Sequence, residues 1–349
     1  MSHTPDVRVR TNPLADRTEG MVTPPTTAAF AAAATDDKPD RAYRLRVDEY
    51  LPDGIRRIAR GQLEIAHDAL SGPSRRDVGE AIHETRKRLK RLRALVRLAR
   101  DAIGQETYER ENTAFRDAGR RLAARRDAQV LLETLDALQK RFADELPPRA
   151  TIGLRARLVD ERTHAEASAS SDDAGIAAVL SALEDGLIRT PAWTFGRDGF
   201  GALSPGLRRI YRRGRKRMRA ARKDPSPENL HEWRKRVKDL WHATQVVRVA
   251  KPKRLKRVSR RAHDLADLLG DGNDLSMLRA YVKTHPECFK DEASAQALLA
   301  VIDRRSDKLR DKALDRGQRL YKRSPKRFVR KIERGWRKRA SDQPRPLAG

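Results

Sequence analysis

The sequence predicts an all-α protein in which one helical unit occurs twice. From about Tyr43 to Arg339 the chain is rich in Ala, Leu, Arg, Lys and Glu, which favour helices, and it shows no strand-like alternation of useful length. A basic octamer that begins His-Glu recurs 148 residues further along the chain. We therefore expect a tandem duplication, with each copy folding as a small antiparallel bundle of about four helices.

Helix-breaking residues divide the chain into segments. Residues 1–40 contain five prolines among Thr, Ala and charged residues, without lasting periodicity, and we interpret them as a disordered arm. Breakers should end or begin helices at 71–74, 147–148, 190–205, 224–227, 251–252 and 324–325. The longest interruption, 190–205, lies near the middle of the helical region. We expect one domain at 41–340, with a first bundle at about 41–190, a second at about 203–340, and a flexible tail at 341–349.

Three pairs of segments relate the two copies. In chain order their offsets are 152, 148 and 147 residues, and this near-constancy makes a chance match improbable. The pairs are Ile55–Ile58 with Leu207–Ile210, His83–Lys90 with His231–Lys238, and Leu122–Asp127 with Leu269–Asp274.

Each octamer lies beside an apolar seam whose members advance by three and four residues, as in a coiled coil. The seams are Ile82, Thr85, Leu89, Leu92, Val96 and Ala99 in the first copy, and Leu230, Trp233, Val237, Leu240, Thr244 and Val247 in the second. One His, one Arg and two Lys follow at steps of 3, 1 and 3 residues, so they share one flank of the helix. Each copy is therefore expected to carry a basic stripe next to its core.

The repeated stripe indicates an anion-binding surface. Like charges one turn apart destabilise a helix, so a chain with no use for them would intersperse acids. A single basic run is also typical of a solvated face, but this one recurs at matched positions. The candidate binding residues in the stripes are His83, Arg86, Lys87, Lys90, His231, Arg234, Lys235 and Lys238. Four further candidates, which recur at an offset of 152, are Arg56, Arg60, Arg208 and Arg212.

The motif histidines leave two interpretations open: a neutral imidazole bonded to a neighbouring helix, or an anion contact that gains charge near neutral pH. His-Glu-x-x-Lys is not the zinc-protease motif, because a lysine stands where the second metal ligand belongs. The sequence has no Walker-type loop, nucleophile elbow or paired-cysteine site. We therefore expect no catalytic residues, no metal, no cofactor and no enzymatic activity. Gly270–Asp274 is expected to be a helix or helix junction rather than a calcium loop.

Charge restricts the partners. The chain has 77 Lys and Arg against 49 Asp and Glu, a net charge of +28 that attracts nucleic acid, anionic membranes and phosphate polymers. Aromatic residues make up only 5%, few for a surface that stacks bases. A single cysteine, Cys288, excludes an internal disulfide. Since no signal-peptide layout or membrane-length apolar run occurs, we expect a cytoplasmic protein without membrane insertion.

These residues resemble a known family. His83–Arg93 and Leu230–Lys238 resemble the two basic motifs of the CHAD domain, the conserved histidine α-helical domain. Leu269–Leu275 is similar to the leucine-glycine and asparagine-aspartate signature that follows the second motif, and Leu122–Asp127 is its degenerate first copy. The resemblance covers roughly 42–339. It implies two four-helix bundles related by pseudo-twofold symmetry around a basic channel.

The resemblance also implies non-catalytic binding of inorganic polyphosphate, in the cytoplasm and in association with polyphosphate granules. Such a polymer offers dense charge and no bases, so it requires cations at fixed spacing rather than aromatic platforms. Asp239 and Trp241 depart from the first copy, which has Arg91 and Arg93 there, and so predict less charge beyond Lys238. Nucleic acid is the alternative partner, as a weaker competitor for the same faces. An enzyme acting on a phosphorylated substrate is the third hypothesis.

Overall fold

The computed structural model describes residues 41–46, 48–71, 78–122, 127–170 and 173–341. They belong to the compact unit Asp40–Gly349 and form eleven α-helices and five short 3-10 helices, with no β-strand among them. For these residues the all-α prediction is confirmed. The predicted arm (1–40) and the predicted tail after Ser341 lie outside the described residues. Within the described ranges, no helix combines the length and the apolar character that crossing a membrane requires.

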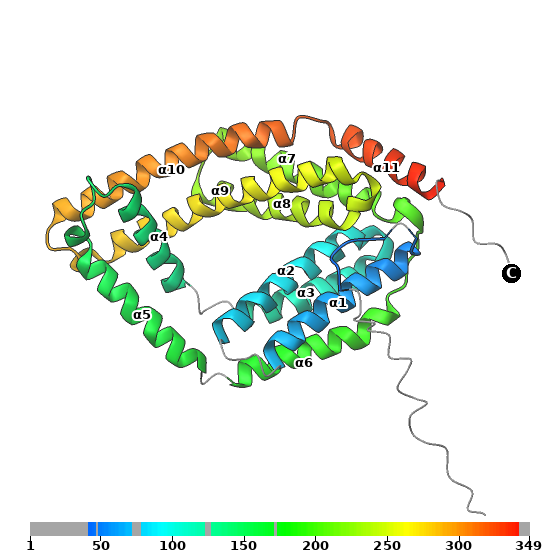
Figure 1. Cartoon of the computed structure of the whole chain (residues 1–349), viewed down its shortest axis with the longest axis horizontal. Coiled ribbons are helices and arrows are strands. Elements are labelled where there is room, and N and C mark those ends of the chain that lie inside the picture. Colours follow the sequence, from blue (N-terminus) through cyan, green and yellow to red (C-terminus); the bar gives the residue numbers. More distant parts are fainter. Residues whose placement is uncertain (1–40, 47, 72–77, 123–126, 171–172, 342–349) are drawn as a thin grey trace, which may run out of the picture. The chain divides into compact units, whose positions relative to one another are not determined.

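Four helices of the first copy pack together (Figure 1). They are α1 (Leu51–Ser71), α2 (Val78–Ile103), α3 (Gln105–Arg121) and α6 (Asp173–Arg189). Helix α2 packs against α1 and α3, and α6 packs against the same two helices. Gly104 alone joins α2 to α3, and its φ of 82° lies in the left-handed region that glycine adopts without strain. This sharp turn places the two helices side by side.

The second copy contains α7 (Ser204–Lys223), α8 (Pro227–Val246), α9 (Pro252–Thr284), α10 (Glu292–Leu320) and α11 (Pro325–Ser341). Helix α8 packs against α7 and α9, α10 packs mainly on α9, and α11 packs on α7. The prolines that the sequence marked as breakers stand in the first turns of α7, α8, α9 and α11. Proline is tolerated there because the first backbone N–H groups of a helix have no partner within it.

Two helices of the first copy pack differently from the expectation of one bundle at 41–190. Helices α4 (Asp127–Arg141) and α5 (Ile152–Ser170) pack on each other, and α4 also packs on α9. They share a separate apolar cluster with the second copy, formed by Leu131, Leu132, Leu135, Leu138, Leu146, Leu154, Leu158, Leu275, Leu278, Val282, Leu298, Val301, Ile302 and Leu309. A hairpin of the first copy is thus buried against the long helices of the second.

The helices around the matched segments 122–127 and 269–274 differ. In the second copy the segment lies inside α9, which continues without a break for 33 residues. In the first copy α3 ends at Arg121 and α4 begins at Asp127, with 123–126 outside the described residues. The expectation of a helix or helix junction at 270–274 is confirmed for the second copy. Gly270–Asp274 is helical in the second copy.

The predicted seams are buried. All six seam residues of α2 are buried, and so are those of the second copy except Leu230, which is partly buried. The Thr85 hydroxyl donates to the carbonyl oxygens of Ala81 (2.9 Å) and Ala66 (3.2 Å), so its burial leaves no unpaired polar group. Trp233 is fully buried and lies against Gly317 of α10. The seams thus form the centre of each helix set.

The two copies meet along α2, which packs on both α7 and α8. Gly206 of α7 lies so close to α2 that a Cβ atom there would overlap the carbonyl oxygen of Leu98. Beside it, Arg209 donates to Asp101 at 2.7 Å and to the carbonyl oxygen of Arg97 at 3.2 Å. The 190–205 junction packs here too, since Gly196 N donates to the Ala102 carbonyl oxygen at 2.9 Å. Close backbone approach therefore fixes the distance between the copies.

We predict that Gly206→Val destabilises the fold by about 1–3 kcal/mol, because the new side chain forces α7 away from the α2 backbone. Urea denaturation followed by circular dichroism measures this. Gly272→Ala in α9 is the control, since a Cβ there meets nothing within 4 Å and alanine favours a helix. Equal stability of the two variants would show that the α2–α7 contact tolerates expansion.

Candidate functional site

A basic cavity of about 540 Å³ lies between α2, α3 and α8. Its lining residues are Arg86, Leu89, Lys90, Arg93, Arg97, Phe115, Arg116, Gly119, Arg120, His231, Glu232, Arg234, Lys235, Arg236, Lys238, Asp239 and His242. Ten of these are Arg or Lys, and two are carboxylates. Six of the twelve sequence candidates line it: Arg86, Lys90, His231, Arg234, Lys235 and Lys238. The contact between α2 and α8 thus brings the two repeated stripes to one place.

The other six candidates do not line this cavity. Lys87 forms an ion pair with Glu84 (2.9 Å), as Lys235 does with Glu232 (2.6 Å) at the cavity edge. The hydrogen bond from Lys235 lowers the pKa of the Glu232 carboxyl, and the nearby charges of Lys235 and Arg236 act in the same direction. His83 takes part in interactions within the fold but is not among the lining residues.

The arginines of α1 and α7 do not join the shared cavity that was expected of them. Arg56 donates to the carbonyl oxygen of Trp193 at 2.7 Å and to Asp53 at 2.8 Å. Arg60 pairs with Glu64 at 2.8 Å. Arg208 and Arg212 line another cavity, beside α11 and Glu333. Recurrence at an offset of 152 therefore matched positions on α1 and α7 that do not line the α2–α8 cavity.

Five lining arginines were not among the sequence candidates, and one of them, Arg236, directly follows Lys235 on α8. Arg93 and Arg97 extend the line of Arg86 and Lys90 by steps of three and four residues, a helical spacing that the sequence already contained. Burial lowers the pKa of Arg93 to about 10, and the nearby Arg97 adds to this shift. Arg116 and Arg120 come from α3, and only the packing of α3 on α2 places them here.

The cavity contains a buried carboxylate that joins the two copies. Asp239 of α8 is 6% exposed and accepts from Arg97 of α2 and from Arg236, each at 2.9 Å. From the sequence, Asp239 predicts only a loss of positive charge relative to Arg91. In the structure it pairs with an arginine of each copy, which keeps two like-charged helices in contact.

The Gly270–Asn273 segment of α9 contacts the basic motif on α8. His231 Nδ1 lies 2.8 Å from the amide oxygen of Asn273 on α9, an arrangement in which the imidazole donates. Gly270, one turn earlier on α9, leaves room for Arg234: a Cβ there would lie 3.0 Å from the Arg234 guanidinium. The Gly-Asp-Gly-Asn segment thus positions two cavity residues of α8. In the first copy the matched residues 123 and 126 lie outside the described residues.

His242 lies at the cavity wall as a packing residue. Burial lowers its pKa to about 3, and the charge of Arg91 adds to the shift, so the imidazole is neutral near pH 7. Its ring stacks on Trp241 (4.6 Å between centroids) and meets the edge of Tyr43 (6.0 Å). Among the described residues, no three His, Cys, Asp or Glu side chains gather as metal ligands would. The arrangement is suited to holding an anion.

Comparison with protein families matches residues 28–283 to the model described as the CHAD domain. The match includes α1 to α8 and almost all of α9. Helices α10 and α11 follow it in the sequence and pack on α9 and α7. The comparison with curated proteins finds no match.

We predict strong coupling between Arg97 and Asp239 in a double-mutant cycle. Asp239→Ala leaves two partly buried arginines without their carboxylate, so each single change should destabilise and the pair should couple by about 1–3 kcal/mol. Chemical denaturation of the two single variants and the double variant measures the coupling. The exposed pair Arg319 and Asp315 is the control and should couple by less than about 0.5 kcal/mol. Additive effects at Arg97 and Asp239 would contradict the bridging role of Asp239.

Proposed function

This chain belongs to the CHAD family, and from that premise we propose that it binds inorganic polyphosphate, without catalysing a reaction, in the cavity between α2, α3 and α8. One observation carries the proposal: the two copies of the basic stripe face one shared cavity. Arg86 and Lys90 come from α2, while Arg234 and Lys238 come from α8. The family is associated with polyphosphate binding.

The chemistry of the lining fits a phosphate polymer. Arginine can bond two phosphate oxygens at once, and lysine acts as a point charge. The cations stand on helices that are held by buried seams, so little backbone freedom is lost on binding. Phe115 is the one aromatic side chain among the lining residues besides the histidines, and it is 1% exposed. This lining offers no platform for stacking bases, which favours polyphosphate over nucleic acid.

The carboxylates of the cavity support a binding role rather than catalysis. Glu232 pairs with Lys235, and Asp239 pairs with Arg97 and Arg236. A general base needs a carboxylate that can take up a proton near neutral pH. The pKa of Glu232 is instead lowered by its hydrogen bond to Lys235, which holds it ionised. Both acids thus position cations.

We extend the proposal to the architecture and the location. The helix sets α1–α2–α3–α6 and α7–α8–α9–α10 are a tandem duplication related by pseudo-twofold symmetry, with the α2–α8 cavity as a basic channel between them. The similar places of α2 and α8 at the centre of their sets support this arrangement. The protein acts in the cytoplasm, in association with polyphosphate granules.

We predict that Arg86→Ala with Lys90→Ala, and Arg234→Ala with Lys238→Ala, each weaken binding of long-chain polyphosphate at least tenfold. Each pair removes two charged contacts, worth roughly 1.5–3 kcal/mol apiece. Calorimetric titration at one fixed salt concentration measures the affinity, and competing DNA and RNA test selectivity.

Two further double variants complete this experiment. Lys283→Ala with Lys312→Ala removes the same charge from exposed positions outside the cavity and should change affinity by less than about twofold. Arg60→Ala with Arg212→Ala tests the candidates on α1 and α7. A loss of affinity there equal to that of the cavity pairs would place the ligand along α1 and α7 instead.

We also predict a log-linear fall of affinity with salt, because binding releases the counterions of the phosphates. By analogy with nucleic acids, each lost lysine contact should reduce the slope by about one. Arg234→Ala with Lys238→Ala should therefore give a slope shallower by about two than the unchanged chain. A flat salt response in the unchanged chain would contradict the proposed cation-lined site.

A further inference from the structure

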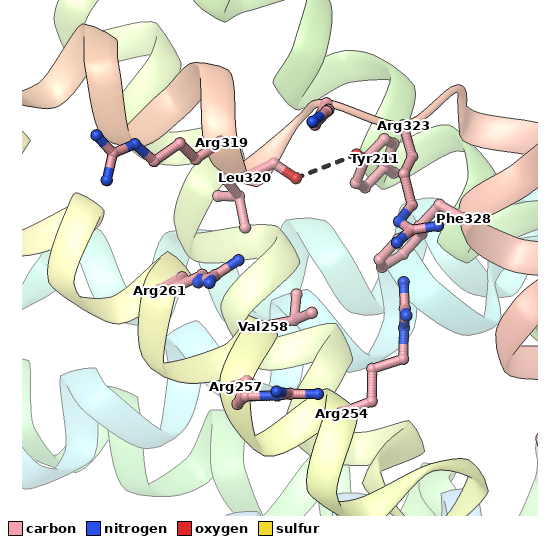
Figure 2. Close-up of a pocket in the computed structure, with 10 residues that line it drawn as sticks. Tyr211, Arg254, Arg257, Val258, Arg261, Arg319, Leu320, Arg323 and Phe328 are labelled. Carbon is pink, nitrogen blue, oxygen red and sulfur yellow. Dashed lines mark hydrogen bonds between the residues drawn. The ribbon is translucent and has the colours of Figure 1, made fainter.

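A second basic cavity, of about 280 Å³, lies in the second copy, away from α2. The beginning of α9, the end of α10, the turn into α11 and one side of α7 surround it (Figure 2). Its lining residues are Tyr211, Arg254, Arg257, Val258, Arg261, Arg319, Leu320, Lys322, Arg323 and Phe328. Six of these ten are cations, and none is an acid.

The cations converge from two directions. Arg254, Arg257 and Arg261 follow each other on α9 at steps of three and four residues, which places them on one face. Figure 2 shows Arg254 and Arg323 extending toward each other beside Phe328. Arg319, by contrast, points away and pairs with Asp315 at 3.0 Å.

The positive charge here is concentrated and weakly compensated. Burial lowers the pKa of Arg254, and the charges of Arg323 and Arg257 lower it further. The Nε atom of Arg254 is buried without a hydrogen-bond partner. Holding like charges together in this way costs free energy unless an anion is bound among them.

The floor of the cavity is apolar and firmly packed. The rings of Tyr211 and Phe328 stack with 4.1 Å between their centroids, and the Tyr211 hydroxyl donates to the carbonyl oxygen of Leu320 at 3.1 Å. Tyr211 and Phe328 are almost fully buried. The arginines therefore stand around a preformed hollow, which lessens the cost of ordering a site when a ligand binds.

The first copy provides an internal comparison. At the offset of 147 residues, Val258 corresponds to Glu111. Glu111 is fully buried and accepts from Arg189 at 3.0 Å and Arg110 at 3.1 Å. The first copy thus neutralises its arginines with an internal carboxylate between α3 and α6. The second copy has valine at this position and keeps its arginines around an open cavity.

We propose that this cavity is a second anion site, which binds a compact oligophosphate group in the place that a carboxylate takes in the first copy. Its volume lies near the lower end of ligand pockets, which span roughly 300–1,000 Å³, so it suits a few phosphate units rather than a folded polymer. The group is either free triphosphate or the end of a polyphosphate chain. The inference does not depend on what the α2–α8 cavity binds.

The test is calorimetric titration of the full chain with inorganic triphosphate. Arg254→Ala with Arg323→Ala removes the two facing cations and should weaken binding at this site about a hundredfold. Val258→Glu recreates the carboxylate of the first copy; it should abolish the same binding event and raise the melting temperature without ligand. Lys283→Ala with Lys312→Ala is the control of equal charge and should leave the event unchanged.

A chain with Arg86→Ala and Lys90→Ala distinguishes binding at the second cavity from binding at the α2–α8 cavity. It should still bind triphosphate. Titrating it with triphosphate and with long-chain polyphosphate, at equal concentrations of chain ends, identifies the source of the group. Equal affinity per end indicates a polymer end, and tighter binding of triphosphate indicates the free molecule. The proposal is overturned if Arg254→Ala with Arg323→Ala leaves triphosphate binding unchanged, or if Arg86→Ala with Lys90→Ala alone removes it.

Discussion

Helices α2 and α8 carry matching basic stripes, and yet they pack against each other. Two such surfaces repel, so the contact requires apolar burial and a local neutralising charge. The buried seams supply the first, and Asp239, shared between Arg97 of α2 and Arg236 of α8, supplies the second. The remaining cations are thereby held around one cavity at short range. The proposed binding site depends on this contact.

Carboxylates pair with some of the cations in and beside the stripes. Glu84 and Glu232 pair with Lys87 and Lys235 one turn along their helices, at the flank of each stripe. At the cavity, burial lowers the pKa of Arg93, and neighbouring cations lower it further. A bound anion would stabilise the charged form of this guanidinium. The second cavity also gathers cations, and none of its lining residues is an acid. In both cavities the lining cations outnumber the lining carboxylates.

The two copies have diverged in ways that matter for function. Asn273 and Gly270 position His231 and Arg234, and α9 continues through this segment. In the first copy α3 ends at Arg121. The following hairpin, α4–α5, packs on α9 and shares an apolar cluster with it and α10, so each copy contributes to the other's core. The chain therefore holds one cavity between α2, α3 and α8 and another around Arg254.

The sequence by itself determined the all-α class, the repeat, both seams and the six stripe residues that line the cavity, because helical periodicity and recurrence are local properties of a chain. It could also have indicated Arg93 and Arg97, which continue the stripe at helical spacing. Only the tertiary structure decided that Arg116 of α3 joins the cavity, that Arg56 bonds the carbonyl oxygen of Trp193 instead, and that α4–α5 packs on the other copy. Those outcomes depend on which helix surfaces meet, and contacts between distant segments leave no spacing pattern in the sequence.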